Sequence, residues 1–372
     1  MATTAAAAAA ASASKSGFNS VVSSFSRRPS LSSRKNPWAR TAARRGNDDA
    51  RDVDRRRDDD ADDDVFGGYL LSKRCWYSAG RRRLSSLTAS SSSSSVSAST
   101  TSDEEEEKEK KSADSSSHVS TVDASAILVP HPDKSATGGE DSCFVLKRSN
   151  AFGVFDGVGG WSDEGVNPAE YSETFASEAA KAVTKEKMRN PVDIMVRAHE
   201  ETRVIGSSTA CVCVVEEGEA TFANLGDAGG LVARNGACVF KTEPMQHEFN
   251  MPFQLGWREA YPETDDPRKA DVKKVRLKRG DCVVLGSDGL WDNVPHEDVA
   301  ILCEENEGDA VKCAEQIARL AFARSTDEEY DSPFMIAARK EGMELTWAEK
   351  LQGVQLTGGK MDDIAVVVAF VG

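Results

Sequence analysis

The sequence predicts an α+β fold that is built on antiparallel β-sheets. Short apolar runs are joined by tight turns such as Glu217-Gly218 and Asn235-Gly236, which indicate β-hairpins. Repeated short hairpins favour antiparallel sheets over a doubly wound parallel sheet. A few longer segments, beginning with residues 167–186, have helical spacing instead.

The first third of the chain does not resemble a folded domain. Residues 1–48 are rich in alanine, serine and arginine and contain no acidic residue before Asp48, a composition typical of an organellar transit peptide. Residues 49–119 combine Arg/Asp stretches, a serine tract and an acidic run, and we expect a solvated linker there. We therefore expect a chloroplast or mitochondrial protein, with a disordered tail on a cytoplasmic protein as the alternative.

Residues 120–372 are expected to form one globular domain, because this length can bury a substantial core. The formal net charge of −15 and the lack of a concentrated basic face argue against nucleic acid as a partner. No apolar segment is long enough to span a membrane. The eight cysteines show no CxxC spacing, which predicts reduced core thiols rather than structural zinc. We expect a monomer.

The folded part begins with a hairpin. Residues 143–156 form two apolar runs joined by a turn at Ser149-Asn150, and the second run ends on Asp156. A capping asparagine and an early proline open the helix at residues 167–186, and residues 191–203 predict a second helix. Further elements are expected at 206–227 (two strands), 231–240 (a hairpin), 273–280 (a half-exposed strand), 299–323 (one long amphipathic helix), 347–351 (part of a helix) and 364–372 (the final strand).

Acidic residues occur at matching ends of these strands. Asp156 and Asp288 follow buried runs and precede glycine, whereas Glu140-Asp141 and Asp362-Asp363 stand just before such runs. In an antiparallel sheet one strand ends beside the start of its neighbour, so these carboxylates can share one edge. A cluster of carboxylates repels itself unless cations or protons neutralise it. Oxygen donors suit Mg²⁺ or Mn²⁺. Any one of these acidic groups alone is more typical of an ordinary turn or strand cap, but four of them at matching strand ends favour a metal site.

Seven motifs occur in an order that resembles the metal-dependent serine/threonine protein phosphatases of type 2C, the PPM family. They are GEDSCF, VFDGVGGW, GSSTA, NLGDAG, MPFQLGW, SDGLWDN and GGKMDDIAVVVA, and the similarity spans residues 129–372. DGVGGW is similar to the compact organellar branch of that family. The resemblance implies a four-layer αββα sandwich of two central antiparallel sheets flanked by helices, with two metal ions at one edge.

The resemblance also implies roles for individual residues. Catalysis would rest on Asp156 and Asp288, and a hydroxide bridging the metals would attack phosphoserine or phosphothreonine in proteins without a phosphoenzyme. The metal ligands implied are Glu140, Asp141, Asp156, the carbonyl of Gly157, Asp288 and Asp362, with Asp227 as a candidate for a third, weaker ion and Asp363 at a position where the family often has asparagine.

Two departures from the family pattern concern the phosphate. Val158 replaces the histidine that would protonate the leaving group, and the arginine that grips phosphate is missing near Ala136. Lys134 or His131 is the expected substitute for that arginine. These departures keep two alternatives open: a non-catalytic binding or regulatory module with the same fold, and a hydrolase of small phosphorylated metabolites.

Overall fold

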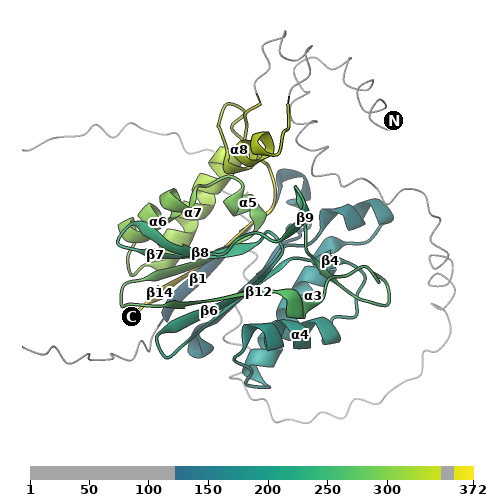
Figure 1. Cartoon of the computed structure of the whole chain (residues 1–372), viewed down its shortest axis with the longest axis horizontal. Helices are drawn as coiled ribbons and strands as arrows, with labels where there is room; N and C mark the ends of the chain where they lie inside the picture. Colours follow the sequence, from purple (N-terminus) through teal and green to yellow (C-terminus); the bar gives the residue numbers. More distant parts are fainter. Residues whose placement is uncertain (1–121, 345–355) are drawn as a thin grey trace, which may run out of the picture.

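The computed structural model describes residues 122–344 and 356–372, which form four layers (Figure 1). Two five-stranded antiparallel sheets pack face to face, and helices cover the outer face of each. This is the predicted αββα sandwich. The transit peptide expected at 1–48, the linker expected at 49–119 and the helix expected at 347–351 lie outside the described residues.

The first sheet has the strand order β1-β14-β13-β7-β8. Its strands are β1 (Val122–Val129), β14 (Ile364–Val371), β13 (Cys282–Gly286), β7 (Gly229–Arg234) and β8 (Ala237–Lys241). Strand β14 lies between β1 and β13, and pairs with β1 from Val122–Val371 to Val129–Ile364. The C-terminal strand therefore closes the sheet against its N-terminal strand.

The second sheet has the order β12-β6-β5-β3-β2. Its strands are β12 (Asp271–Arg276), β6 (Glu219–Leu225), β5 (Ala210–Glu216), β3 (Ala151–Phe155) and β2 (Ser142–Leu146). Two short ladders accompany it, β4 (Ser207–Ser208) with β11 (Leu255–Gly256) and β9 (Gln246–Glu248) with β10 (Met251–Pro252). The half-exposed strand expected at 273–280 begins two residues earlier, as the edge strand β12.

Helices form the two outer layers. Helices α3 (Pro168–Thr184) and α4 (Pro191–Glu201) pack on the second sheet, and α5 (Asp288–Trp291), α6 (His296–Glu305) and α7 (Ala310–Ser325) pack on the first (Figure 1). The remaining helices are α8 (Pro333–Lys340) and the short 3₁₀ turns η2 (Pro132–Lys134), η3 (Lys147–Ser149), η4 (Gly159–Glu164) and η5 (Pro267–Lys269). No helix in the described ranges combines the length and apolar character that a membrane span needs.

The sequence of strand β14 is apolar without interruption because both faces of the strand are covered. Ala365, Val367 and Ala369 face the other sheet, whereas Val366 and Val368 face the helices. Successive side chains of a strand point to opposite faces, so a strand with both faces covered needs apolar residues at every position. All eight residues of β14 are buried.

The expected turns are present and have the backbone they require. Asn235 and Gly236 have φ of 49° and 70°, and Glu217 and Gly218 have φ of 49° and 73°. Positive φ at both central positions matches the right-handed twist of the strands that the turn joins. Asn150 likewise adopts the left-handed conformation after η3, at the first predicted turn.

The single long helix expected at 299–323 was wrong. Two helices, α6 and α7, occupy this segment and are separated at residues 306–309. Gly308 has φ of 79°, which ends helical geometry, and the Asp309 side chain accepts a hydrogen bond from the backbone N–H of Lys312 to start α7. The apolar spacing that predicted one helix continues through residues 306–309, where the pair Gly308-Asp309 marks the break.

Strand pairing brings the acidic segments to one edge. Ser142 pairs with Phe155, so Asp141 and Asp156 flank neighbouring strands of the second sheet. In the first sheet Gly286 pairs with Val366, which places the segment before β14 beside the residues that follow β13.

Candidate metal centre

Three aspartates from different strand ends form the centre of this edge. Asp156 follows β3, Asp227 follows β6 after one glycine, and Asp288 is the first residue of α5. Each offers a carboxylate oxygen, and these three oxygens lie within 4.8 Å of one another. Carboxylates at this spacing repel each other strongly unless positive charge or protons lie among them.

The electrostatics of the cluster show this repulsion. Burial raises the pKa of Asp156 well above its ordinary value, and the charges of Asp288 and Asp141 raise it further. Burial and Asp288 raise the pKa of Asp227 to about 7, with Lys360 acting in the opposite direction. The cluster therefore holds protons near neutral pH when no cation neutralises it.

Asp141 stands next to this cluster with neither carboxylate oxygen hydrogen-bonded to the described residues. Burial raises its pKa, followed by the charge of Asp363, while the nearby Ser287 hydroxyl opposes the shift without a hydrogen bond of ordinary geometry. One oxygen of Asp227 lacks a partner in the same way. Buried polar atoms without partners are rare because each costs free energy, so these oxygens indicate a ligand.

Asp363 contacts the loop before β2. Its carboxylate accepts hydrogen bonds from the backbone N–H groups of His131 (2.7 Å) and Glu140 (3.0 Å) and from Nζ of Lys134 (3.0 Å). The same ammonium donates to Oε2 of Glu140 at 2.6 Å. Asp363 therefore fastens the loop of residues 131–140 to the start of β14.

Asp362 has different surroundings. One of its oxygens accepts from the backbone N–H of Asp363 at 2.9 Å, and burial followed by the charge of Asp288 raises its pKa to about 7. The two neighbours thus have different contacts: Asp362 is coupled electrostatically to Asp288 of the three-aspartate cluster, whereas Asp363 hydrogen-bonds the loop of Lys134 and acts electrostatically on Asp141.

Lys360 is a member of the site that the sequence interpretation missed. Its side chain is almost fully buried, and Nζ lies 2.5 Å from Oδ2 of Asp288 and 2.6 Å from Oδ2 of Asp292. The side chain of Asn293 hydrogen-bonds both backbone groups of Lys360: its amide nitrogen donates to the carbonyl, and its amide oxygen accepts from the N–H. The only signal in the sequence is a lysine two residues before the acidic pair, a position that normally indicates a solvated side chain.

Glycines allow the segments of the site to approach closely. A Cβ atom at Gly157 would lie 2.5 Å from the backbone oxygen of Glu140, and one at Gly289 would lie 2.0 Å from the backbone oxygen of Asp363. Both contacts involve backbone atoms, which cannot move aside as a side chain can. Gly157 therefore allows the segment of Asp156 to approach that of Glu140, and Gly289 allows the segment of Asp288 to approach that of Asp363.

The phosphate-binding residues expected from the sequence lie at the rim. The ring of His131 accepts a hydrogen bond from the N–H of Asp133, and burial followed by Lys134 lowers its pKa, so it is neutral at pH 7. Lys134 makes the ion pairs described above. Val158 is buried and offers no side-chain donor.

Comparison with known proteins identifies the family. Residues 266–330 match the family described as Protein phosphatase 2C. The chain is 36% identical to Probable protein phosphatase 2C 26 of Arabidopsis thaliana, over 65% of this chain and 80% of that protein. The chain belongs to the protein phosphatase 2C family. A second relative from the same plant, Probable protein phosphatase 2C 80, is also 36% identical, over 67% of this chain, and the chain spans 58% of that relative's length.

A solved structure agrees with this membership. The X-ray structure of the photosystem II phosphatase PBCP superimposes with a TM-score of 0.64 at 34% identity, covering 68% of this chain and 99% of that one. The class of enzyme predicted from the sequence, a metal-dependent protein serine/threonine phosphatase, is thereby confirmed.

The residues of this phosphatase 2C chain fit the divalent cations that the family requires. The three clustered aspartates supply hard oxygen donors, and the oxygens of Asp141 that lack partners are oriented by the fold rather than by hydrogen bonds. No histidine or thiol belongs to the cluster of Asp156, Asp227 and Asp288. The donor set therefore suits magnesium or manganese better than zinc.

Proposed function

We propose that the chain removes phosphate from phosphoserine and phosphothreonine in proteins of a plastid or mitochondrion, using two Mn²⁺ or Mg²⁺ ions. The observation that carries the proposal is the cluster of Asp156, Asp227 and Asp288 beside the unpartnered oxygens of Asp141. An acidic centre of this kind is unstable without cations and lies where three strand ends and a helix start meet.

The residues divide into two groups around the cations. Asp156, Asp288 and Asp362 would hold one ion together with the carbonyl of Gly157, and Glu140 and Asp141 would position water on the other. Asp227 would serve a third, weaker ion. Bound there, the cations would neutralise the phosphoryl oxygens and lower the pKa of a water molecule, the chemistry that hydrolysis of a phosphate monoester needs.

Lys134 is the residue that we assign to the phosphate. Its ammonium has three N–H donors, of which Glu140 and Asp363 use two within the described residues. Its side chain is 30% exposed and positively charged, whereas the ring of His131 is neutral at pH 7. Lys134 can therefore contact a phosphate oxygen without leaving its partners.

Two observations support the proposed organellar location. The segment of residues 1–48 has the composition of a transit peptide, and the similar solved structure is that of a photosystem II phosphatase. Together they favour a plastid, with phosphorylated proteins rather than small metabolites as substrates. A fluorescent fusion of the full chain tests this: label in plastids is expected, and label spread through the cytoplasm would contradict it.

Phosphate release from a phosphothreonine peptide tests the activity itself. With Mn²⁺ or Mg²⁺ we expect turnover that a chelator abolishes, and Asp156→Asn or Asp288→Asn should lower the rate at least about 100-fold, since each removes a charge from the centre. Turnover of free phosphorylated metabolites but not of the peptide would contradict the proposed substrate class. A folded, cation-loaded chain with no turnover on either would favour the non-catalytic module.

A further inference from the structure

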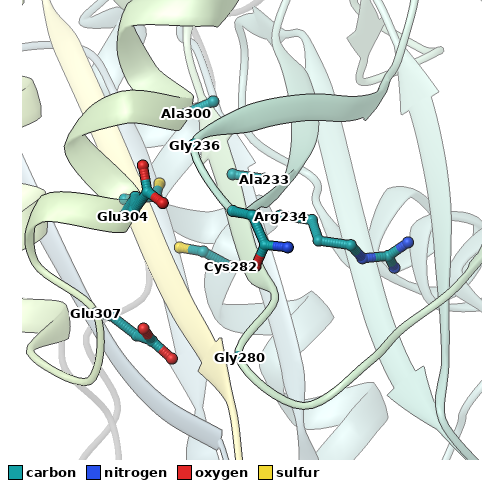
Figure 2. Close-up of a pocket in the computed structure, with 10 residues that line it drawn as sticks. Ala233, Arg234, Gly236, Gly280, Cys282, Ala300, Glu304 and Glu307 are labelled. Carbon is teal, nitrogen blue, oxygen red and sulfur yellow. The ribbon is translucent and has the colours of Figure 1, made fainter. Parts of the chain in front are cut away.

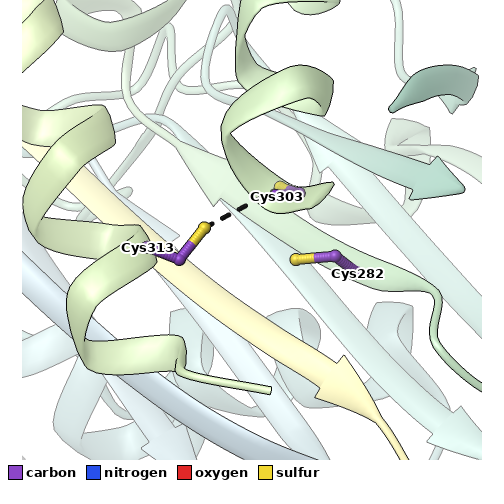
Figure 3. Close-up of side chains that lie close together, drawn as sticks. All are labelled: Cys282, Cys303 and Cys313. Carbon is purple, nitrogen blue, oxygen red and sulfur yellow. Dashed lines mark hydrogen bonds between the residues drawn. The ribbon is translucent and has the colours of Figure 1, made fainter. Parts of the chain in front are cut away.

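A second group of side chains lies in the layer between the first sheet and its helices. Cys282 on β13, Cys303 on α6 and Cys313 on α7 bring their sulfur atoms within 4.8 Å of one another, and all three are buried (Figure 3). The sulfur atoms of Cys303 and Cys313 are 4.0 Å apart. The three thiols come from segments that the sequence separates, so no local spacing reveals them.

The spacing of the sulfurs suits coordination of one ion. A metal–sulfur bond of about 2.3 Å places three sulfurs around one ion at roughly 4 Å from one another. A disulfide needs a sulfur–sulfur distance of about 2.05 Å, so two of these residues would have to move together to form one. The observed arrangement is thus closer to a three-sulfur ligand set than to a disulfide.

A small cavity reaches this cluster. It has a volume of about 40 Å³, and its lining includes Cys282, Cys303, Glu304 and Glu307 (Figure 2). A single water molecule needs only roughly 10–15 Å³ of such volume, so the cavity admits a small ion together with water.

The three sulfurs are thiols that a bound cation would deprotonate. Sγ of Cys313 donates to the carbonyl oxygen of Leu302 at 3.7 Å and to Sγ of Cys303 at 4.0 Å. A divalent cation that binds all three sulfurs would release three protons to solvent and leave a complex with one net negative charge.

We propose that Cys282, Cys303 and Cys313 form a binding site for a soft or borderline cation of the Zn²⁺ type, separate from the acidic centre. Thiolate ligands select such ions over Mg²⁺ and Mn²⁺. Cys282 starts β13 and Asp288 follows its end, so about six residues of extended chain, roughly 20 Å, separate the two sites. An ion at the three cysteines ties α6 and α7 to β13, the strand that delivers Asp288.

Titration of the full-length, reduced and metal-stripped chain with Cd²⁺ tests the proposal. Excess Mg²⁺ keeps the acidic centre filled, and absorption from thiolate-to-Cd²⁺ charge transfer reports sulfur ligation alone. We expect one tightly bound Cd²⁺ per chain, displaced by Zn²⁺. Cys303→Ala and Cys313→Ala should each weaken binding by at least about tenfold, because each removes a direct ligand.

Two control variants separate this site from other thiols. Cys213→Ala removes a thiol that is equally buried but belongs to the core between the sheets, and Cys75→Ala removes the one cysteine outside the described residues. Both should bind Cd²⁺ as the parent does, and Mg²⁺-dependent phosphatase activity verifies that every variant is folded. The proposal is overturned if the parent chain gives no charge-transfer band, or if folded Cys303→Ala and Cys313→Ala keep it at full strength.

Discussion

At the scale of single residues, the ammonium of Lys360 is the only positive charge in direct contact with Asp288 among the described residues. It also contacts Asp292, whose pKa burial raises to about 6. In the cation-free protein this lysine offsets part of the carboxylate repulsion. When divalent cations bind, the same ammonium is a like charge next to them and weakens their binding. Lys360 therefore affects the balance between the cation-free and the cation-bound protein.

Replacing Lys360 should shift that balance. Lys360→Met leaves buried carboxylates without their partner, so we expect the free energy of unfolding in chelator to fall by about 3 kcal/mol. Saturating Mg²⁺ should restore more stability to the variant than to the parent, because a competing positive charge is gone. Thermal unfolding with chelator and with Mg²⁺ measures both values. Lys274→Met, at an exposed ion pair with Glu219, is the control; an equal gain from Mg²⁺ in Lys360→Met and the parent would contradict the argument.

The sequence locates some residues of the site better than others. Asp156 and Asp288 could be found because each ends a buried run next to glycine, a local pattern. The different contacts of Asp362 and Asp363 could not be predicted, because they depend on which of the two carboxylates, both just before β14, meets the loop of Lys134. The burial of Lys360 likewise arises only when residues 288–293 pack against the segment before β14.

At the scale of secondary-structure elements, the position of Asp288 depends on how closely α5 approaches β14. Gly289 permits that approach, since an added Cβ would lie 2.0 Å from the backbone oxygen of Asp363 and 3.0 Å from its carbonyl carbon. Both atoms belong to the backbone, so the helix itself would have to shift.

Gly289→Ala should therefore displace Asp288 and impair the site. We expect a loss of phosphatase activity of at least about tenfold and a destabilisation of about 1–3 kcal/mol from overpacking. Gly342→Ala is a matched control, because nothing lies within 4 Å of its added Cβ and only the left-handed backbone is strained. Activity on a phosphopeptide and thermal unfolding test both variants. Full activity in Gly289→Ala would show that α5 tolerates the shift.

Local signals predicted the elements best. The hairpin turns were correct because Asn-Gly and Glu-Gly pairs determine their own backbone. Strand β1 was not among the expected elements: its sequence, VDASAILV, mixes polar and small residues, and its burial comes from pairing with β14 at the other end of the domain. The break between α6 and α7 was overlooked because apolar spacing continues through it.

At the scale of the whole molecule, the acidic centre couples folding to both pH and cations. The pKa of Asp227 and of Asp362 is raised from 3.8 to about 7 in the folded, cation-free chain. Between these values the folded state holds protons that the unfolded state has lost, so stability falls as pH rises from about 4 to 7. Above pH 7 these carboxyl groups are ionised in both the folded and the unfolded state, and the loss of stability stays constant.

Cations offset this loss of stability because they bind the ionised carboxylates. Below pH 7 they must also displace the protons that these groups hold. We therefore expect the stabilisation gained from a fixed concentration of Mg²⁺ to be larger at pH 8 than at pH 5. Below pH 7 the dissociation constant for Mg²⁺ should rise by about tenfold for each unit by which the pH falls, for each proton displaced. Calorimetric titration at pH 6 in buffers of different ionisation enthalpy counts those protons. Asp227→Asn should release fewer protons than the parent, and a parent chain that binds Mg²⁺ without releasing protons would contradict the coupling.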